Sequence, residues 1–397
     1  MCPAATRSSR QTLLLRIAAR PRADPMTTRL IPFTDDHLFA VKAFNQRLKA
    51  GGVAMQYPES VLPTWLPPSE NALPFQEHFV ALDDDGSVRG GYILKHQSFK
   101  IGDEFVEIAD LRLPISEGII DRTFANLGVE LLFDSLRKQP LLFGMGIGGE
   151  GEAIARLFKA GGWKLTPIPF FFKIVSPYRF LRGIRFLRNS TPQRLMLDAL
   201  AFSGLGTIAA HSCQKLSAGL SHYPPAASVK IVHQFGDWAN TLWQSCNSQY
   251  GVIAIRDASV LNRLYNPSEE KFIRLRVSLP SGTIGWCVVM DTQMSGHRQF
   301  GDLRVGSIVD ALASPKVAEI VVHVAANFLA RRGVDLIVSN QSHHEWCTAL
   351  RRSGFLKGPS NYLFATSKRL TKLIECAGHA PNQYYLNRGD GDGPINL

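Results

Sequence analysis

Two groups of side chains in this sequence have the chemistry of metal ligands. His343, His344 and Cys347 lie close together, with His344 and Cys347 on one face of a predicted helix. Asp390 and Asp392 form a second pair in the Gly-rich end of the chain. Neither group has the further ligands that a closed metal site needs. We therefore expect no metal, a helix cap and packing roles for the first group, and a docking or flexible tail for the second.

A run of arginines forms a third group, because Arg179, Arg182, Arg185 and Arg188 recur every three residues among apolar side chains. A basic and apolar segment of this kind lies on an anionic membrane or a nucleic acid, or packs between two domains. We expect a helical linker over residues 176–229. Peripheral membrane contact through residues 178–188 stays open, and nucleic-acid binding is not expected.

Length and composition limit the architecture. The chain has 397 residues, 45% hydrophobic and 19% charged, with a net charge of +11. This predicts two globular domains with a basic surface that suits an anionic ligand. The six cysteines are far apart and form no CxxC pair, so we expect neither a zinc ribbon nor a disulfide framework, and a reducing cytoplasm. Residues 1–26 are Arg-rich and are expected to be a disordered extension or to precede the true start.

The first half predicts an α/β (α+β) order of elements. A strand at 28–33 precedes a helix in which Val41, Phe44 and Leu48 recur at helical spacing. HFVAL and VRGGYIL flank the turn DDDG and predict a hairpin, and EFVEIADLRL predicts the next strand. A helix around residues 124–136, the strand PLLFGMGI, the helix EGEAIARLFKAGG and the strand WKLTPIPFFFKIV follow.

The second half repeats this order from the helix FGDWANTLWQSC to the strand NYLFATS. Gly91 and Gly285 are 194 positions apart, and the helix-ending Gly162 and Gly354 are 192 apart. A nearly constant offset predicts duplication, with two tandem domains that each contain a mixed, mainly antiparallel sheet flanked by helices.

These segments resemble the GNAT superfamily of acyl-CoA transferases. The strand, Pro-containing loop and helix in LRLPISEGIIDRTFANLGVELLF, and the helix ends ARLFKAGGW and TALRRSGF, carry the resemblance. RDASVLNRLYNP is similar to a stretch seen in tandem members of the family. The resemblance covers about 28–175 and 230–367 and implies an N-terminal domain over 27–175, a C-terminal domain over 230–368 and a C-terminal tail over 369–397.

The resemblance implies transfer of an acyl group from acetyl-CoA or another acyl-CoA to an amine acceptor. Backbone groups of a splayed strand would bind the pantetheine arm, and the following helix start would bind the phosphates. A carboxylate would take the proton of the amine, and Ser116 or water would protonate the thiolate. The residues placed in these roles are Leu113 and Ile115 for pantetheine, Gly118, Ile119, Asp121, Arg122 and Thr123 for the phosphates, and Glu107, Asp110 and Ser116 for catalysis.

The loop departs from the family pattern, since Glu117, Ile120 and Arg122 stand where Arg or Gln, Gly, and Gly or Ala are usual. Phe158 and Leu350 stand where a proton-donating tyrosine is common. Two alternatives therefore stay open: a catalytically lapsed tandem GNAT protein that binds a ligand or partner, and an aminoacyl transferase of the peptidoglycan-bridge type.

Overall fold

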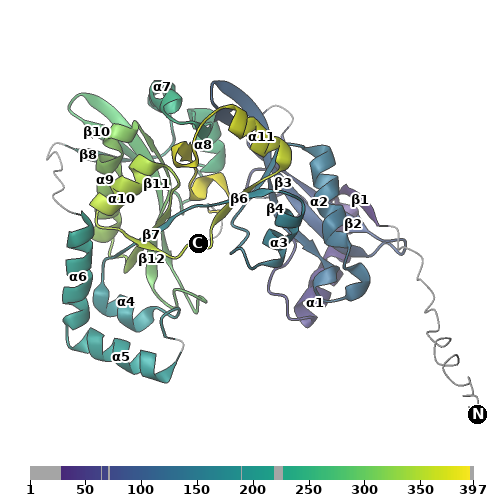
Figure 1. Ribbon diagram of the computed structural model, residues 1–397, viewed down its shortest axis with the longest axis horizontal. Helices are drawn as coiled ribbons and strands as arrows, with labels where there is room; N and C mark the ends of the chain where they lie inside the picture. The colour runs from purple at the N-terminus through teal and green to yellow at the C-terminus, as the bar shows by residue number, and fades with distance from the viewer. Residues whose placement is uncertain (1–27, 64, 70–71, 189, 219–226, 394–397) are drawn as a thin grey trace, which may run out of the picture.

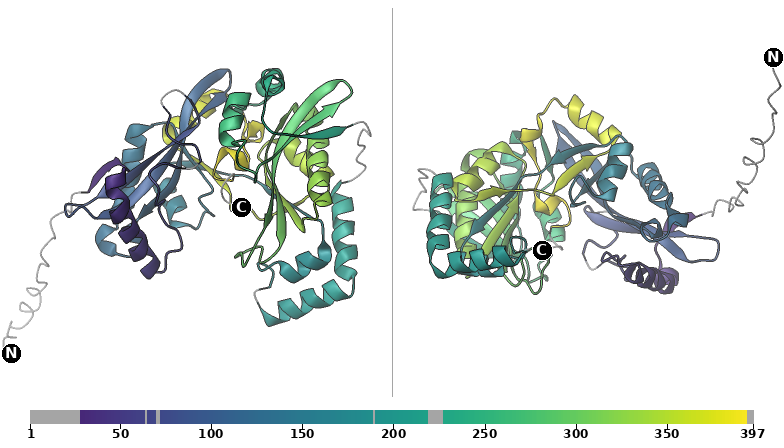
Figure 2. Two further views of the ribbon diagram at one scale, coloured as in Figure 1. Left: turned by 180° about the vertical axis from the view of Figure 1, so that it is seen from behind. Right: turned by 60° about the horizontal axis from the view of Figure 1, so that its bottom comes forward.

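The computed structural model describes residues 28–63, 65–69, 72–188, 190–218 and 227–393. The predicted extension over residues 1–26 lies outside them. The described chain forms two lobes side by side, each built on one β-sheet with helices packed against it (Figures 1 and 2). Both sheets are mixed and mainly antiparallel, which confirms the predicted fold class.

The first half of the chain forms its elements in the predicted order. The hairpin of β2 and β3 encloses the DDDG turn, and α1 buries Val41, Phe44 and Leu48 as their spacing predicts. The elements are β1 (Arg29–Pro32), α1 (Leu38–Ala50), β2 (Phe75–Leu82), β3 (Val88–Ile101), β4 (Glu104–Ser116), α2 (Leu127–Lys138), β5 (Leu142–Met145), α3 (Ala153–Ala160), β6 (Lys164–Pro167) and β7 (Phe170–Ile174).

The second half repeats the arrangement around a large core cluster that includes the buried Trp286. Its elements are β8 (Ser228–Val232), α7 (Asp237–Cys246), β9 (Val252–Ala254), α8 (Ala258–Leu264), β10 (Ile273–Leu279), β11 (Gly282–Gln293), β12 (Arg304–Ala313), α9 (Ala318–Arg331), β13 (Leu336–Asn340), α10 (His344–Arg352), β14 (Leu356–Gly358) and β15 (Leu363–Thr366).

The two halves exchange their last strands. The first sheet runs β1-β2-β3-β4-β5-β15-β6 and the second runs β14-β7-β13-β12-β11-β10-β8. The segment WKLTPIPFFFKIV, predicted as one strand, is therefore two strands in different sheets. Pro167 and Pro169 explain the break, because proline has no N–H and cannot continue a central ladder. The predicted domain boundaries stay predictions, and β7 lies in the second lobe.

The linker contains α4 (Pro177–Gly183), α5 (Thr191–Phe202) and α6 (Leu205–Ala218). In Figure 1, α6 lies along the side of the second lobe that faces away from the first lobe, and α4 and α5 lie at the lower end of the second lobe. No single helix of the described residues is long and apolar enough to cross a membrane; α5 and α6 together pass by length and composition but meet at an angle of 83°.

The C-terminal segment returns to the space between the lobes (Figure 1). After α11 (Lys368–Cys376), the short strand β16 (Tyr384–Tyr385) pairs in parallel with β9, and β9 itself pairs with β3. One ladder therefore connects the C-terminal segment to both halves of the chain.

Strand exchange predicts that the two lobes unfold together. Phe364 on β15 is buried and packs against Phe143 on β5, with ring centroids 5.5 Å apart. Phe364→Ala is expected to lower the free energy of unfolding by about 3–5 kcal/mol. Urea titration followed by tryptophan fluorescence should still show one transition. Ile231→Ala, at an exposed position on β8, is the control and should change stability by less than about 0.5 kcal/mol. Two separate transitions would contradict the coupling.

Candidate functional site

Strand β4 loses its neighbour on one side halfway along its length. It pairs with β3 over almost its whole length, but its parallel pairing with β5 is limited to Ala109 and Asp110. A bulge follows at Leu113, whose φ of 46° is unusual for a branched residue. On the β5 side, no strand of the described residues pairs with 111–116. The backbone groups of this edge can therefore hydrogen-bond an extended ligand.

Asp110 marks the point where the pairing ends. Its Oδ1 accepts a hydrogen bond from the Met145 amide at 3.2 Å. Its Oδ2 is buried and has no hydrogen-bond partner within the described residues. Burial raises the pKa of Asp110 to about 7, against the opposing effect of Lys95 and Arg112. A carboxyl group with this pKa can both take up and release a proton near neutral pH.

Two further buried polar side chains lie near Asp110, and the sequence did not single them out. Lys95 stands opposite Asp110 on β3 and donates to the carbonyl oxygens of Asp390 and Gly391; burial lowers its pKa to about 8. The hydroxyl of Tyr362 has no hydrogen-bond partner within the described part of the chain. Burial raises the pKa of Tyr362 well above its usual value, so this hydroxyl stays protonated.

The loop after β4 is closed on the side of α1. Glu117 is buried and forms ion pairs with Arg47 at 2.6 Å and Arg89 at 3.2 Å. Ile120 packs on Gly51, where an added Cβ would lie 2.3 Å from the Ile120 Cγ2 atom. Glu117 therefore points inward with its charge compensated, and it does not repel an anion placed at the outer side of the loop.

The first turn of α2 has backbone amides without an acceptor, whereas several amides of the preceding loop are already hydrogen-bonded. Within the loop, the amides of Ile120 and Asp121 donate to the Glu117 carbonyl, and the Thr123 amide donates to the Asp121 carboxylate at 2.9 Å. In contrast, the Leu127 and Gly128 amides have no acceptor within the described part of the chain. A helix start with free amides binds anions well.

Gly128 leaves the space in front of this turn open. An added Cβ would meet only the Ser116 Oγ at 3.8 Å and the Leu157 Cδ2 at 4.0 Å. The end of β4 and the first turn of α2 are therefore adjacent. Leu157 is one of the partly buried apolar residues at the edge of the cluster under α2.

The structure separates the two predicted carboxylates. Glu107 and Asp110 are three residues apart on a strand, so their side chains lie on opposite faces of the sheet. Glu107 borders an open hollow of about 800 Å³. There its carboxylate lies 3.6 Å from the His96 Nδ1 atom, and the Nε2 atom of the same ring lies 2.7 Å from Glu77.

The other predicted residues take different positions along the edge. Ser116 lies six residues beyond Asp110, roughly 20 Å away along an extended strand. Ile115 is buried in the cluster under α1, so only its backbone faces the unpaired edge, and Leu113 packs beside the same cluster. The remaining predicted residues lie in the loop, mostly at the surface: Gly118, Ile119, Asp121, Arg122 and Thr123. Their roles stay predictions.

The second half has the same break in pairing, but side chains fill it. Strand β12 pairs with β13 only as far as Ser307, and its bulge follows at once. The Tyr385 hydroxyl donates to the Ala311 carbonyl, and the side-chain amide of Asn387 donates to the Asp310 carboxylate at 2.7 Å. A cavity of only about 10 Å³ remains there.

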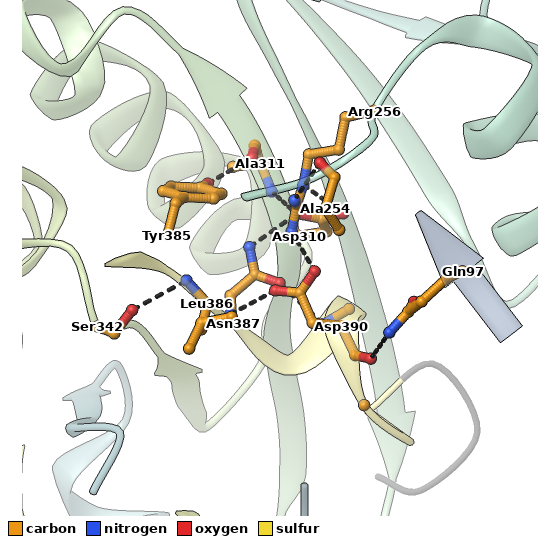
Figure 3. Close-up of polar contacts among 12 residues, drawn as sticks. Gln97, Ala254, Arg256, Asp310, Ala311, Ser342, Tyr385, Leu386, Asn387 and Asp390 are labelled. Carbon is orange, nitrogen blue, oxygen red and sulfur yellow. Dashed lines mark hydrogen bonds and ion pairs between the residues drawn. The ribbon is translucent and has the colours of Figure 1, made fainter. Parts of the chain in front are cut away.

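A buried charge cluster holds the C-terminal segment in place (Figure 3). Arg256 is fully buried and contacts Asp310 at 3.0 Å and Asp390 at 2.8 Å. Asp390, predicted to lie in a tail, is thus part of the core between the lobes. No group of three or more His, Cys, Asp or Glu side chains among the described residues is arranged to hold a metal ion.

No family model and no curated protein matches the sequence. The fold is similar to that of N-myristoyltransferase from Saccharomyces cerevisiae with bound myristoyl-CoA, with a TM-score of 0.50, 10% identity, and coverage of 85% of this chain and 82% of that chain. It is also similar to a probable N-acyltransferase from Enterococcus faecalis, with a TM-score of 0.50, 9% identity, and coverage of 88% of this chain and 74% of that chain. At these identities the likeness shows a shared fold.

Asp110 predicts a pH dependence of stability. Its pKa in the folded chain is about 7, above the usual 3.8, so between these values the folded state holds the proton more tightly than the unfolded state. The contribution of Asp110 to the free energy of unfolding therefore falls as the pH rises from about 4 to 7. Asp110→Asn should match the wild type at pH 4 and become the more stable protein by pH 7.5 in urea titrations. A variant that loses stability equally at every pH would contradict the raised pKa.

Proposed function

Because this chain has the two-lobed GNAT-type fold, we propose that it transfers an acyl group from an acyl-CoA thioester to an amine. One observation carries the proposal: the unpaired edge of β4 runs from the ionisable Asp110 to the free amides at the start of α2. This edge offers hydrogen bonds along an extended chain and an anion site at its end, as a pantetheine diphosphate requires. The bound myristoyl-CoA of the yeast structure supports the choice of ligand class.

The residues present fit the ligand in one half only. The backbone of 111–116 would bind the pantetheine arm, and the Leu127 and Gly128 amides would bind a phosphate at the positive end of the helix dipole. The exposed Arg122 lies in the preceding loop and would add a charge-assisted contact. In the second half, Tyr385 and Asn387 occupy the corresponding edge of β12. We therefore assign acyl-CoA binding to the first half.

Asp110 is the proposed general base. An acyl-CoA supplies an acyl group activated as a thioester, and the amine must lose a proton to become an amide. Asp110 accepts this proton, because its pKa of about 7 leaves it partly ionised at neutral pH. Glu107 is less suitable, since it lies on the other face of the sheet beside the hollow.

Tyr362 is the proposed donor of a proton to the departing thiolate. Its hydroxyl is protonated and without a hydrogen-bond partner among the described residues. Together with Met145, whose amide binds Asp110, it borders Gly391. Ser116 is too far from Asp110 to act on the same reacting atoms, because the strand places them roughly 20 Å apart.

Gly128→Glu tests the binding site directly. The new carboxylate would enter open space at the start of α2, where it would repel a phosphate and occupy the amides without straining the helix. Isothermal titration with acetyl-CoA and myristoyl-CoA should show one site in the wild type and at least a tenfold weaker affinity in the variant. Val129→Glu, at the adjacent exposed position, is the matched control and should bind as the wild type does. If Gly128→Glu bound acyl-CoA as tightly as Val129→Glu does, the result would contradict the assigned site.

Asp110→Asn tests the chemistry separately from binding. We expect the rate of thiol release to fall by about 10²–10⁴-fold, with acyl-CoA affinity within about twofold of the wild type. The wild-type rate should rise with pH through about 7, as Asp110 loses its proton. Thiol release would be followed with acetyl-CoA or myristoyl-CoA and a panel of amines: lysine methyl ester, a peptide α-amine and glucosamine. Saturable binding without thiol release for every amine would favour a catalytically lapsed binding protein.

A further inference from the structure

The linker helices carry large apolar side chains on their outer face. Half of the eighteen large, exposed apolar residues of the described chain fall within residues 178–216. On α5, Leu195 and Phe202 lie seven residues apart on one face, and on α6, Leu205 and Ile208 lie three apart. The solvent side of a surface helix is normally polar. The other members of this apolar surface are Tyr178, Phe186, Leu187, Met196 and Leu216.

The opposite face of these helices is already packed. Leu197 and Ala201 of α5 are buried, and the side-chain amide of Gln214 on α6 donates to the Ile174 carbonyl at 2.9 Å. Arg188 and Asp198 fix α5 to the turn before it with two contacts, at 2.8 and 3.0 Å. The outward direction of the apolar residues is therefore built into the fold.

Basic side chains lie among the exposed apolar ones. Residues 177–218 contain six basic residues and a single acidic one, Asp198. The Arg182 guanidinium lies over the rings of Tyr178 and Phe202, at 5.9 and 5.1 Å from their centroids. Arg179 has 68% of its side chain exposed, and its guanidinium lies 3.6 Å from the buried Asp335 carboxylate. A surface of this composition complements apolar chains under a layer of anionic groups.

We propose that α4, α5 and α6 form a docking surface for an anionic membrane. The apolar side chains would enter the boundary between headgroups and acyl chains, and the arginines would contact the lipid phosphates. The helices would lie on the bilayer, because α5 and α6 meet at 83° and no single described helix is long enough to span it. A second copy of the chain fits less well, since it would bring two strongly basic surfaces together. This inference does not depend on the proposed acyl transfer.

Vesicle co-sedimentation with the full chain tests the proposal. We expect binding to vesicles of 70% phosphatidylcholine and 30% phosphatidylglycerol, and at least tenfold weaker binding to pure phosphatidylcholine or in 0.5 M salt. Leu195→Ser/Phe202→Ser/Ile208→Ser should lose at least tenfold in affinity for the anionic vesicles. Arg179→Glu/Lys215→Glu should weaken binding to the anionic vesicles alone.

A matched triple variant controls for general loss of apolar surface. Phe39→Ser/Phe105→Ser/Phe133→Ser removes three exposed aromatic residues from the first lobe and should bind vesicles as the wild type does. Thermal unfolding by circular dichroism would show that all variants are folded. Equal binding to neutral and anionic vesicles, or no binding, would overturn the proposal. So would a wild-type dimer in sedimentation velocity that the linker triple variant converts to monomer, since a second copy would then cover this surface.

Discussion

The backbone N–H and C=O groups of a β-strand need hydrogen-bond partners, and this need shapes both lobes. Both halves of the chain contain a strand, β4 or β12, whose parallel neighbour stops pairing with it before its end. In the second half, the Tyr385 hydroxyl donates to the Ala311 carbonyl, and Asn387 covers the same edge by binding the Asp310 carboxylate. In the first half, no strand and no comparable side chain among the described residues covers the β5 side of 111–116. The same backbone geometry thus gives one filled edge and one edge free for a ligand.

The surroundings of Asp110 come from distant parts of the sequence, and strand exchange holds them together. β15 lies in the sheet of the first half and β7 in the sheet of the second half. Neither sheet is therefore complete without a strand from the other half. The C-terminal segment is fixed by Arg256, whose burial is tolerable only because Asp310 and Asp390 compensate its charge. Lys95 then contacts the backbone of the same segment. Burial raises the pKa of Asp110, and the charges of Lys95 and Arg112 oppose this shift.

Local patterns predicted the elements well, and long-range contacts explain what they missed. The spacing of Val41, Phe44 and Leu48 and the DDDG turn predicted α1 and the hairpin, since both depend on neighbouring residues. The exchange at Pro167 and Pro169 depends on a partner strand almost two hundred residues away. The alternation of side chains along a strand is by itself enough to place Glu107 and Asp110 on opposite faces of β4. Nothing local marked Lys95 or Tyr362. Asp390 stood out only as one of two nearby carboxylates in the Gly-rich end of the chain, and its pairing with the distant Arg256 could not be read from that pattern.

Hydrogen–deuterium exchange with a thioether analogue of acetyl-CoA shows whether the ligand lies along β4. At a saturating concentration of the analogue, we expect slower exchange at residues 111–116 and at Leu127 and Gly128. We expect no change at residues 308–313, where Tyr385 already covers the strand. Slower exchange confined to residues 308–313, or saturable binding that leaves 111–128 unchanged, would contradict the claim that the unpaired edge of β4 is the acyl-CoA site.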